Sequence, residues 1–444
     1  METQKPTRRQ LLQLPILLAA GAKLSAATPK HLPLKPLAFA SPRISFEDEY
    51  FLGDISRRSV LYFLEHASPV TGMVRDRARN FVEDPSQPNL SPASIAATGF
   101  CLTALCIGAE RGYLPGLEAQ QRIRKTLDFL VNQAYQNHGW FYHFMDADTG
   151  ERKLKSEVSS IDTAILVAGA LTAKQYFPHD REIAKLTDTL YGRMDFHWML
   201  NGHRHLLSHG WRPGSGFINH RWDTYSEHMM LYLLGIGSPT YPLRAESWYA
   251  WRRPHVEYKN YGYITGAGSL FTHQYSHAWV DFRNRSEVGT GINWFQNSIA
   301  ATRAHREFCL SLAPEHGYSA ELWGVTSSDS PRGYRDWGGS FSRSSFDGTV
   351  VPCAAGGSLM FTPDICIPAL QAMHTRFSAR LYQRYGFSDA FNPQTNWTGT
   401  DVLGIDLGIT MLSAENLRTG NVWRWFMKNP EITSALNLAR LLPA

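Results

Sequence analysis

The sequence predicts a mostly α-helical fold in which paired helices close into a toroid. Apolar residues recur at helical spacing in many segments, whereas the two-residue alternation typical of strands is scarce. No sequence repeat of fixed period favours a solenoid instead. Because 43% of the 444 residues are hydrophobic and only 19% are charged, the chain can bury a large core. We therefore expect inner helices that line a core and outer helices that cover them.

The segments with a helical pattern cover most of the chain, and we expect residues 46–444 to form one domain. In chain order, the expected helices are 47–66, 94–111, 118–135, 161–176, 182–193, 225–235, 240–252, 293–312, 363–385, 406–415 and 421–441.

Long loops rich in Trp, Tyr, His and Gly separate several of these helices. They cover residues 203–223, 255–291 and 314–357. Long structured loops in a compact domain usually carry function. We expect them to gather at one end of the toroid and to form a cleft.

The N-terminus has the layout of an export signal of the twin-arginine type. Arg8 and Arg9 precede a short apolar stretch and then small residues, and the apolar stretch is too short for a comfortable membrane span. A disordered tail with a chance Arg pair is the alternative. We expect residues 1–27 to be a signal peptide, residues 28–45 to be a Pro-rich linker, and the mature protein to be periplasmic or secreted without a membrane anchor.

Charge and cysteine content exclude several classes of protein. The formal net charge is +5, no basic stripe is visible, and so we expect no nucleic-acid partner. Neither an HExxH nor a CxxC pattern is present, so we expect no metal and no cofactor. The cysteines are too few and too scattered for a disulfide framework, at positions Cys101, Cys106, Cys309, Cys353 and Cys366.

Three clusters of acidic residues lie in or beside apolar runs. The first holds Glu157 and Asp162, the second is Glu227 at the start of an apolar helical run, and the third spans residues 401–415 with Asp406 inside it. Charged side chains are rarely buried unless they are paired or used. The helix dipole also favours a carboxylate at the start of a helix, so each cluster could have a purely structural role instead. Three such clusters together favour a carboxylate-lined site.

Aromatic residues in the polar loops indicate the class of ligand. Flat rings stack on the C–H faces of sugars, while His, Asn and Asp bind hydroxyl groups. Most aromatic residues in any protein pack in the core, but those in polar loops favour a polysaccharide or oligosaccharide ligand. They are Trp140, Trp211, Trp222, Tyr334, Trp337 and Trp397.

Seven long motifs follow one another along the chain: HGWFYHFMDADTGER, SEVSSIDTAILVAGAL, YSEHMMLYLLGIGSP, SLFTHQYSHAWVDFR, WGVTSSDSPRGY, DGTVVPCAAGGSLMFTPD and GIDLGITMLSAENLRTG. In this order they resemble the glycoamylase-like family of bacterial endo-β-1,2-glucanases, and a similar domain occurs in cyclic β-1,2-glucan synthases. The resemblance covers about residues 50–435 and implies an (α/α)6 toroid and hydrolysis of β-glucan.

The resemblance also implies roles for the acidic residues. Glu227 corresponds to a general acid that protonates the leaving glycosidic oxygen, and Asp406 is the leading candidate for the base. Glu157 is expected to bind a sugar hydroxyl at the cleavage point and is the reserve candidate for either catalytic role. Asp162 is expected to bind substrate or to cap a helix.

Further residues of these motifs are expected to contact the sugar. A serine hydrolase would need a GxSxG turn, and none is convincing, so the histidines and glutamine of SLFTHQYSHAWVDFR suit hydroxyl binding. Asp281 could instead form a structural ion pair with Arg283, without contacting the sugar. Asp347 could instead serve only to form a turn with Gly348. The expected substrate contacts, besides Asp162, are Trp140, His143, Trp222, Tyr225, His273, Gln274, His277, Trp323, Tyr334 and Trp397.

Alternative functions stay open at this point. Within enzymes, the chain could be a β-1,2-glucan transglycosylase or an exo-acting glucosidase. A non-catalytic periplasmic glycan-binding protein could use the same aromatic cleft, although binding alone does not need several carboxylates. We expect a monomer.

Overall fold

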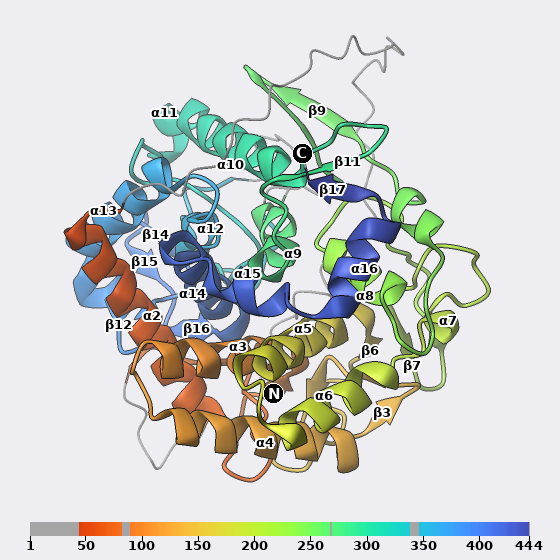
Figure 1. Cartoon of the computed structure of the whole chain (residues 1–444). Helices are drawn as coiled ribbons and strands as arrows, with labels where there is room; N and C mark the ends of the chain where they lie inside the picture. Colours follow the sequence, from red (N-terminus) through yellow and green to blue (C-terminus); the bar gives the residue numbers. More distant parts are fainter. Residues whose placement is uncertain (1–43, 82–88, 267–268, 338–345, 444) are drawn as a thin grey trace.

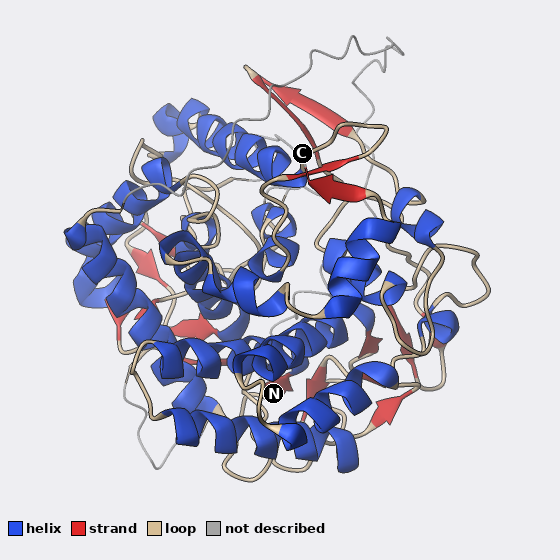
Figure 2. Cartoon of the chain, in the orientation of Figure 1, coloured by secondary structure: helices blue, strands red, loops and turns tan. Residues whose placement is uncertain are grey.

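The structure is a computed structural model, and it describes residues 44–81, 89–266, 269–337 and 346–443. The expected signal peptide, and the expected linker up to residue 43, lie outside the described residues. Helices dominate the chain and confirm the expected all-α class, while the strands are short pieces between them (Figure 2). The helices are α2 (Phe46–His66), α3 (Ile95–Glu110), α4 (Gly116–Asn132), α5 (Ser160–Tyr176), α6 (Arg181–Gly192), α7 (Phe196–Met199), α8 (Met229–Ile236), α9 (Tyr275–Trp279), α10 (Trp294–Ser311), α11 (Ala313–His316), α12 (Pro352–Gly356), α13 (Pro363–Leu381), α14 (Gly404–Arg418), α15 (Asn421–Phe426) and α16 (Pro430–Leu438).

The helices differ in how much of their surface is buried. Helices α3, α5, α8, α9, α12 and α14 are buried on nearly all sides, as their almost continuous apolar sequences require. Helices α2, α4, α6, α10 and α13 bury only one side. Figure 1 shows the latter at the periphery, around α3, α5, α9, α12 and α14. The chain therefore has inner helices and outer helices.

Side-chain caps fix where several helices begin. Ser94 Oγ accepts a hydrogen bond from the Ala97 backbone N–H at 3.2 Å, and Ser159 Oγ accepts one from Asp162 N at the same distance. Asn293 caps α10 in the same manner. A cap satisfies one of the backbone N–H groups that have no partner within the helix. The starts of α3 and α5 are therefore set by local sequence.

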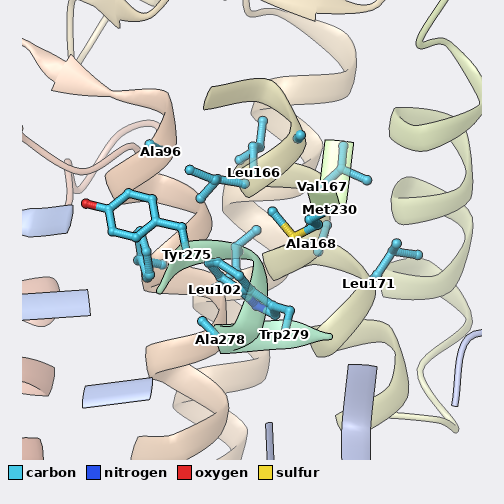
Figure 3. Close-up of a cluster of buried hydrophobic side chains, with 14 of the residues drawn as sticks. Ala96, Leu102, Leu166, Val167, Ala168, Leu171, Met230, Tyr275, Ala278 and Trp279 are labelled. Atoms are coloured by element: carbon cyan, nitrogen blue, oxygen red, sulfur yellow. The ribbon is translucent and has the colours of Figure 1, made fainter. Parts of the chain in front are cut away.

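Helices α3 and α5 cross with their backbones in direct contact. A Cβ atom added to Gly169 would lie 2.0 Å from the Gly99 carbonyl oxygen, and one added to Gly99 would lie 2.4 Å from Ile165 O. Only glycine permits this approach. Around the crossing, side chains from α3, α5, α8 and α9 pack into one apolar cluster, which includes Leu102, Leu166 and Trp279 (Figure 3).

The strands pair antiparallel and connect the loops that lead into the inner helices. Strand β1 pairs with β16, β2 with β5, and β6 with β7 and then β8. The strands are β1 (Arg77–Arg79), β2 (Ala93–Ser94), β3 (Gln136–Asn137), β4 (Trp140–Phe141), β5 (Phe144–Met145), β6 (Val158–Ser159), β7 (Gly210–Arg212), β8 (Gly216–Phe217), β9 (His255–Tyr258), β10 (Tyr261–Ile264), β11 (Arg285–Glu287), β12 (Tyr382–Gln383), β13 (Gly386–Phe387), β14 (Phe391–Asn392), β15 (Trp397–Thr398), β16 (Asp401–Leu403) and β17 (Leu441–Pro443).

The structure differs from the expected helices at several places. The segment 421–441 is two helices, because Pro430 has no backbone N–H to continue the first and instead begins α16. The segment 240–252 contains only the 3-10 turn η1 (Ala245–Tyr249). Helices α9 and α12 were not expected, since five residues are too few for a helical apolar period.

Candidate active site

A continuous set of hydrogen bonds connects the segments that precede α14, α3 and α5. The Gly404 N–H donates to Asp76 O at 2.8 Å, and the Ile95 N–H donates to His143 O at 3.2 Å. The His143 N–H in turn donates to Glu157 O at 2.9 Å. The acidic residues around the starts of α14 and α5 therefore belong to one connected region at the same end of these helices.

Glu157 lies immediately before β6, with a buried carboxylate between two basic side chains. His143 Nδ1 lies 3.5 Å from Glu157 Oε1, and Arg212 Nη2 lies 3.6 Å from Oε2. An adjacent guanidinium favours the ionised form of a carboxyl group. This environment suits a charged acceptor for a sugar hydroxyl better than it suits a proton donor.

Asp162 is part of the helix cap at the start of α5. Its carboxylate accepts a hydrogen bond from Ser159 Oγ, and its own backbone N–H donates back to that oxygen. Ser159 is therefore the N-cap of α5, and the Asp162 carboxylate accepts from the hydroxyl group of that cap. Asp162 Oδ2 also lies 3.8 Å from His143 Nδ1. Asp162 thus has a buried, hydrogen-bonded position next to the Glu157 group and is not itself the cap.

Glu227 lies two residues before α8, and its side chain is buried. Ser226 Oγ donates a hydrogen bond to Oε2 of Glu227, and Ser276 Oγ donates to its backbone carbonyl at 2.6 Å. In the part of the chain that the structure describes, the Glu227 carboxylate forms no salt bridge. Without a cation to hold its charge, Glu227 differs in environment from Glu157.

Trp222 connects the Glu157 and Glu227 segments. Its indole Nε1 donates to Ser160 Oγ at 2.8 Å, and its ring stacks on His209 with centroids 3.9 Å apart. The Ser160 N–H donates to His209 O at 3.2 Å. A tryptophan expected to stack on sugar is thus also a bridge between two acidic segments.

Asp406 lies in the first turn of α14 and is paired with a residue that the sequence did not single out. Asp389 and Asp406 line the same small cavity, and the charge of Asp406 raises the pKa of the Asp389 carboxyl group. The backbone N–H of Asp329 donates to Asp389 Oδ2 at 2.6 Å. Asp329 in turn binds Arg77 at 2.9 Å, and Arg77 lies 3.6 Å from Asp401. Four segments far apart in the sequence therefore meet at Asp406.

Burial and neighbouring charges raise the pKa of Asp389. Its pKa is well above the ordinary value, because burial penalises the charged form and the neighbouring carboxylates of Asp406 and Asp329 repel a further negative charge. Both Asp389 and Asp406 line a cavity of about 20 Å³. That volume suits about one water molecule, so a sugar ring does not fit there.

Several aromatic residues expected to bind sugar pack in the core instead. The rings of Trp140, Tyr225 and Trp323 are fully buried and have no exposed face for a ligand. Trp140 Nε1 donates to Asp195 O at 3.0 Å, and Tyr225 stacks on Trp294. Tyr334 and Trp222 are also buried, whereas Trp397 in β15 is partly exposed. Of these rings, only that of Trp397 has the exposure that sugar stacking needs.

The residues of SLFTHQYSHAWVDFR are enclosed among core groups. Gln274 Nε2 donates to Ala354 O at 2.9 Å and joins the start of α9 to α12. His273 Nδ1 shares a hydrogen bond with Tyr225 OH at 3.1 Å, and His277 Nε2 shares one with Ser298 Oγ at the same distance. Burial lowers the pKa of both histidines to about 3, so they are neutral at pH 7. We assign Gln274 and His277 to the packing of the inner helices and not to direct sugar binding.

Other charged residues have structural partners at the positions that the sequence left open. Arg283 pairs with Asp281 through two hydrogen bonds of 2.9 and 2.8 Å, which is the ion pair that was the alternative. Asp347 Oδ1 accepts a hydrogen bond from Thr349 N at 3.0 Å across a turn in which Gly348 has φ 88°. Glu415, at the other end of α14 from Asp406, is fully buried against Arg111. It therefore does not belong to the acidic region.

Within the described ranges, no group of three or more His, Cys, Asp or Glu side chains could hold a metal ion. None of the helices there is both long enough and apolar enough to span a bilayer.

Comparison with known proteins confirms the resemblance to the glycoamylase-like family. Residues 219–430 match the family described as "Putative glucoamylase". The chain is 27% identical, over 436 residues, to an exo-β-1,2-glucooligosaccharide sophorohydrolase (non-reducing end) of Parabacteroides distasonis. This match covers 88% of the chain but only 57% of the length of that relative.

Solved structures of β-1,2-glucanases share the fold. The endo-β-1,2-glucanase of Chitinophaga pinensis, solved with sophorotriose and glucose, has a TM-score of 0.82 at 25% identity, over 90% of this chain and 99% of that one. A β-1,2-glucanase of Parabacteroides distasonis has the same TM-score at 26% identity, over 91% of this chain and 61% of that one. The similarity extends over almost the whole described part of the chain.

Proposed function

We propose that the protein is a glycoside hydrolase that cleaves β-1,2-glucan, with the inner and outer helices arranged as an (α/α)6 toroid. The observation that carries the proposal is the likeness to the Chitinophaga pinensis endo-β-1,2-glucanase over 99% of that chain. The buried carboxyl groups at the starts of α5, α8 and α14 are in keeping with it. Binding of a neutral glucan does not by itself require them.

In this proposal Glu227 is the general acid and Asp406 the base. Ser226 Oγ donates a hydrogen bond to Oε2 of Glu227. The other carboxyl oxygen, Oε1, would therefore carry the proton to the leaving glycosidic oxygen. Asp406 would take a proton from the attacking water, because its position in the first turn of α14 favours a negative charge. Glu157, held by Arg212, would bind a hydroxyl group of the sugar at the cleavage point.

The first experiment measures new reducing ends on a panel of glucans. We expect the mature protein to release short oligosaccharides from linear β-1,2-glucan. Release from a β-1,3- or α-1,4-glucan with none from β-1,2-glucan would contradict the substrate. Cyclic or lengthened products would identify a transglycosylase, and binding without turnover on the whole panel would identify a glycan-binding protein.

A second experiment separates the two catalytic roles. Glu227→Gln and Asp406→Asn should each lower turnover about a hundredfold or more, the usual scale for loss of an acid or base. A substrate with an activated leaving group needs little protonation, so it should restore Glu227→Gln far more than Asp406→Asn. If Glu157→Gln, and not Glu227→Gln, is restored by that substrate, then Glu157 is the acid.

The names of the relatives include both endo-acting and exo-acting cleavage of the glucan chain. One is named as an endo-acting glucanase and another as an exo-acting sophorohydrolase. Product sizes at early times distinguish them: a ladder of oligosaccharides indicates endo action, and a single disaccharide indicates exo action. We further propose that the protein works as an exported monomer of one domain.

A further inference from the structure

Asp389 is a buried carboxyl group to which the proposed mechanism gives no part. It lies between β13 and β14, its side chain is enclosed, and it lines the same small cavity as the proposed base Asp406. Two buried carboxyl groups that share a site resist ionising together, because the two negative charges repel each other. We therefore expect a proton on one of the pair.

We propose that Asp389 holds this proton and is a positioning residue, which donates a hydrogen bond to Asp406 and keeps that carboxylate ionised and oriented as the base. The proposal rests on the function proposed above, in which Asp406 is the base. It adds a residue that the sequence analysis did not identify.

The groups around the pair indicate which carboxyl group carries the proton. Asp406 lies in the first turn of α14, where the positive end of the helix dipole favours a negative charge. Asp389 lies outside any helix, and its Oδ2 already accepts the Asp329 N–H at 2.6 Å. Its Oδ1 is buried and meets no hydrogen-bond donor among the described groups. A proton on Oδ1 of Asp389 would fill that position and would be available for a hydrogen bond to Asp406.

The nearby charges do not compensate a negative charge on Asp389. The only cation in the described part of this network is Arg77, and it is surrounded by three carboxylates: Asp329 at 2.9 Å, Asp76 at 3.4 Å and Asp401 at 3.6 Å. A second negative charge beside Asp406 would therefore add to an excess of acidic groups. The raised pKa of Asp389 agrees with this arrangement.

Two variants of Asp389 test the role. Asp389→Asn can donate from its amide to Asp406 and accept from the Asp329 N–H, but it cannot ionise. We expect it to keep kcat within about threefold of the wild type. Asp389→Leu has a similar size but no donor, so the base Asp406 should lose a hydrogen bond that favours its ionised form. The acid limb of the pH–kcat profile should then move to higher pH by about one unit, with at least a tenfold loss of kcat below that limb. Asp401→Asn, which removes a nearby carboxylate, should leave the limb in place.

A direct measurement locates the proton without relying on activity. The infrared C=O stretch of neutral carboxylic acids at pH 7 should be weaker in Asp389→Asn than in the folded wild type. The same loss should appear in the Glu227→Gln background, where the proposed general acid contributes no band. This readout remains available if Asp389→Leu does not fold, or if the protein proves inactive on β-1,2-glucan.

The outcomes that overturn the proposal are separate from failure of the proposed function. The same pH–kcat profile for Asp389→Asn and Asp389→Leu, or a neutral carboxyl band of unchanged strength in Asp389→Asn, would refute the positioning role. Inactivity of the wild type on every glucan would refute the proposed function, while the infrared band would still decide where the proton lies.

Discussion

Replacement of Glu415 by Gln should destabilise the protein without slowing the chemistry. Glu415 is fully buried at the last turn of α14, where Arg111 binds Oε2 through Nε at 2.9 Å and Nη2 at 2.8 Å. Oε1 accepts from Thr419 Oγ1 and Asn421 Nδ2, each at 2.7 Å. Whichever way a Gln amide turns, its NH₂ group faces donors.

The size of the effect follows from these contacts. Breaking a buried ion pair on one side costs about 3–5 kcal/mol. We expect the lower end, about 3 kcal/mol, because Arg111 keeps Glu49 as a partner at 3.4 Å. Unfolding entropy of about 2.1 cal/mol/K per residue over roughly 400 residues gives about 0.8 kcal/mol/K. The melting temperature should therefore fall by about 4 °C.

The assay is calorimetry together with kcat at a temperature well below the transition. Glu415 is nine residues from Asp406, about 14 Å along the helix at 1.5 Å per residue, so kcat per folded molecule should not change. Glu49→Gln is the matched control: Glu49 is half exposed, and its buried partner Arg418 keeps Glu415 at 3.8 Å, so the loss of stability should be smaller than for Glu415→Gln. A large loss of kcat in Glu415→Gln with an unchanged melting temperature would refute this reasoning. It would indicate that Glu415 acts in the chemistry and not in the stability of the fold.

Three further predictions concern export, packing and pH. Replacing Arg8 and Arg9 by Lys should leave precursor in the cytoplasm, as fractionation would detect, whereas normal delivery would show that another route is used. Gly169→Ala would place a Cβ atom 2.0 Å from a carbonyl oxygen of α3. It should lower the free energy of unfolding, measured by urea titration, by about 1–3 kcal/mol. An unchanged urea midpoint would mean that α3 and α5 can separate at no cost. His273 and His277 have pKa values lowered to about 3 by burial, so the unfolded chain takes up their protons as pH falls below about 6.5. Their contribution to stability is complete above that pH and should be lost toward pH 3, by about 1.4 kcal/mol per pH unit for each histidine, and a flat profile of denaturation midpoints between pH 7 and 4 would contradict it.

The sequence predicted the helices whose signals are local. The apolar periodicity predicted helices at 94–111 and 161–176, which agree with α3 and α5, and the structure adds Ser94 and Ser159 as their caps. The boundary at Pro430 was missed because the apolar pattern continues across it, although proline cannot. Helices α9 and α12 depend on packing among the inner helices, and five residues carry no period that could predict them.

The acidic site was only partly predictable for a similar reason. Glu157, Glu227 and Asp406 were identified because carboxylates beside apolar runs need an explanation. Asp389 lies in a short segment between two strands and has no such signal. Its importance comes from its position beside Asp406 and its hydrogen bond to the backbone of Asp329, which are contacts between distant segments. Burial of Trp140 and Trp323 was equally hidden, because a loop tryptophan looks the same in sequence whether its ring points out or in.

The glycine crossing of α3 and α5 has a consequence for how the protein can respond when a ligand binds. Where two helices touch through side chains, rotamer changes let the helices slide or separate in response to a ligand. Between Gly99 and Gly169 there are no side chains to rearrange, so the distance between the two backbones is fixed by van der Waals contact. The segments that hold Glu157 and Asp406 are both anchored next to this rigid contact, one before α5 and the other in α14 against α3. In the function proposed above, α3 and α5 would therefore keep their distance when a glucan binds, and any change of shape would have to come from elsewhere in the complex.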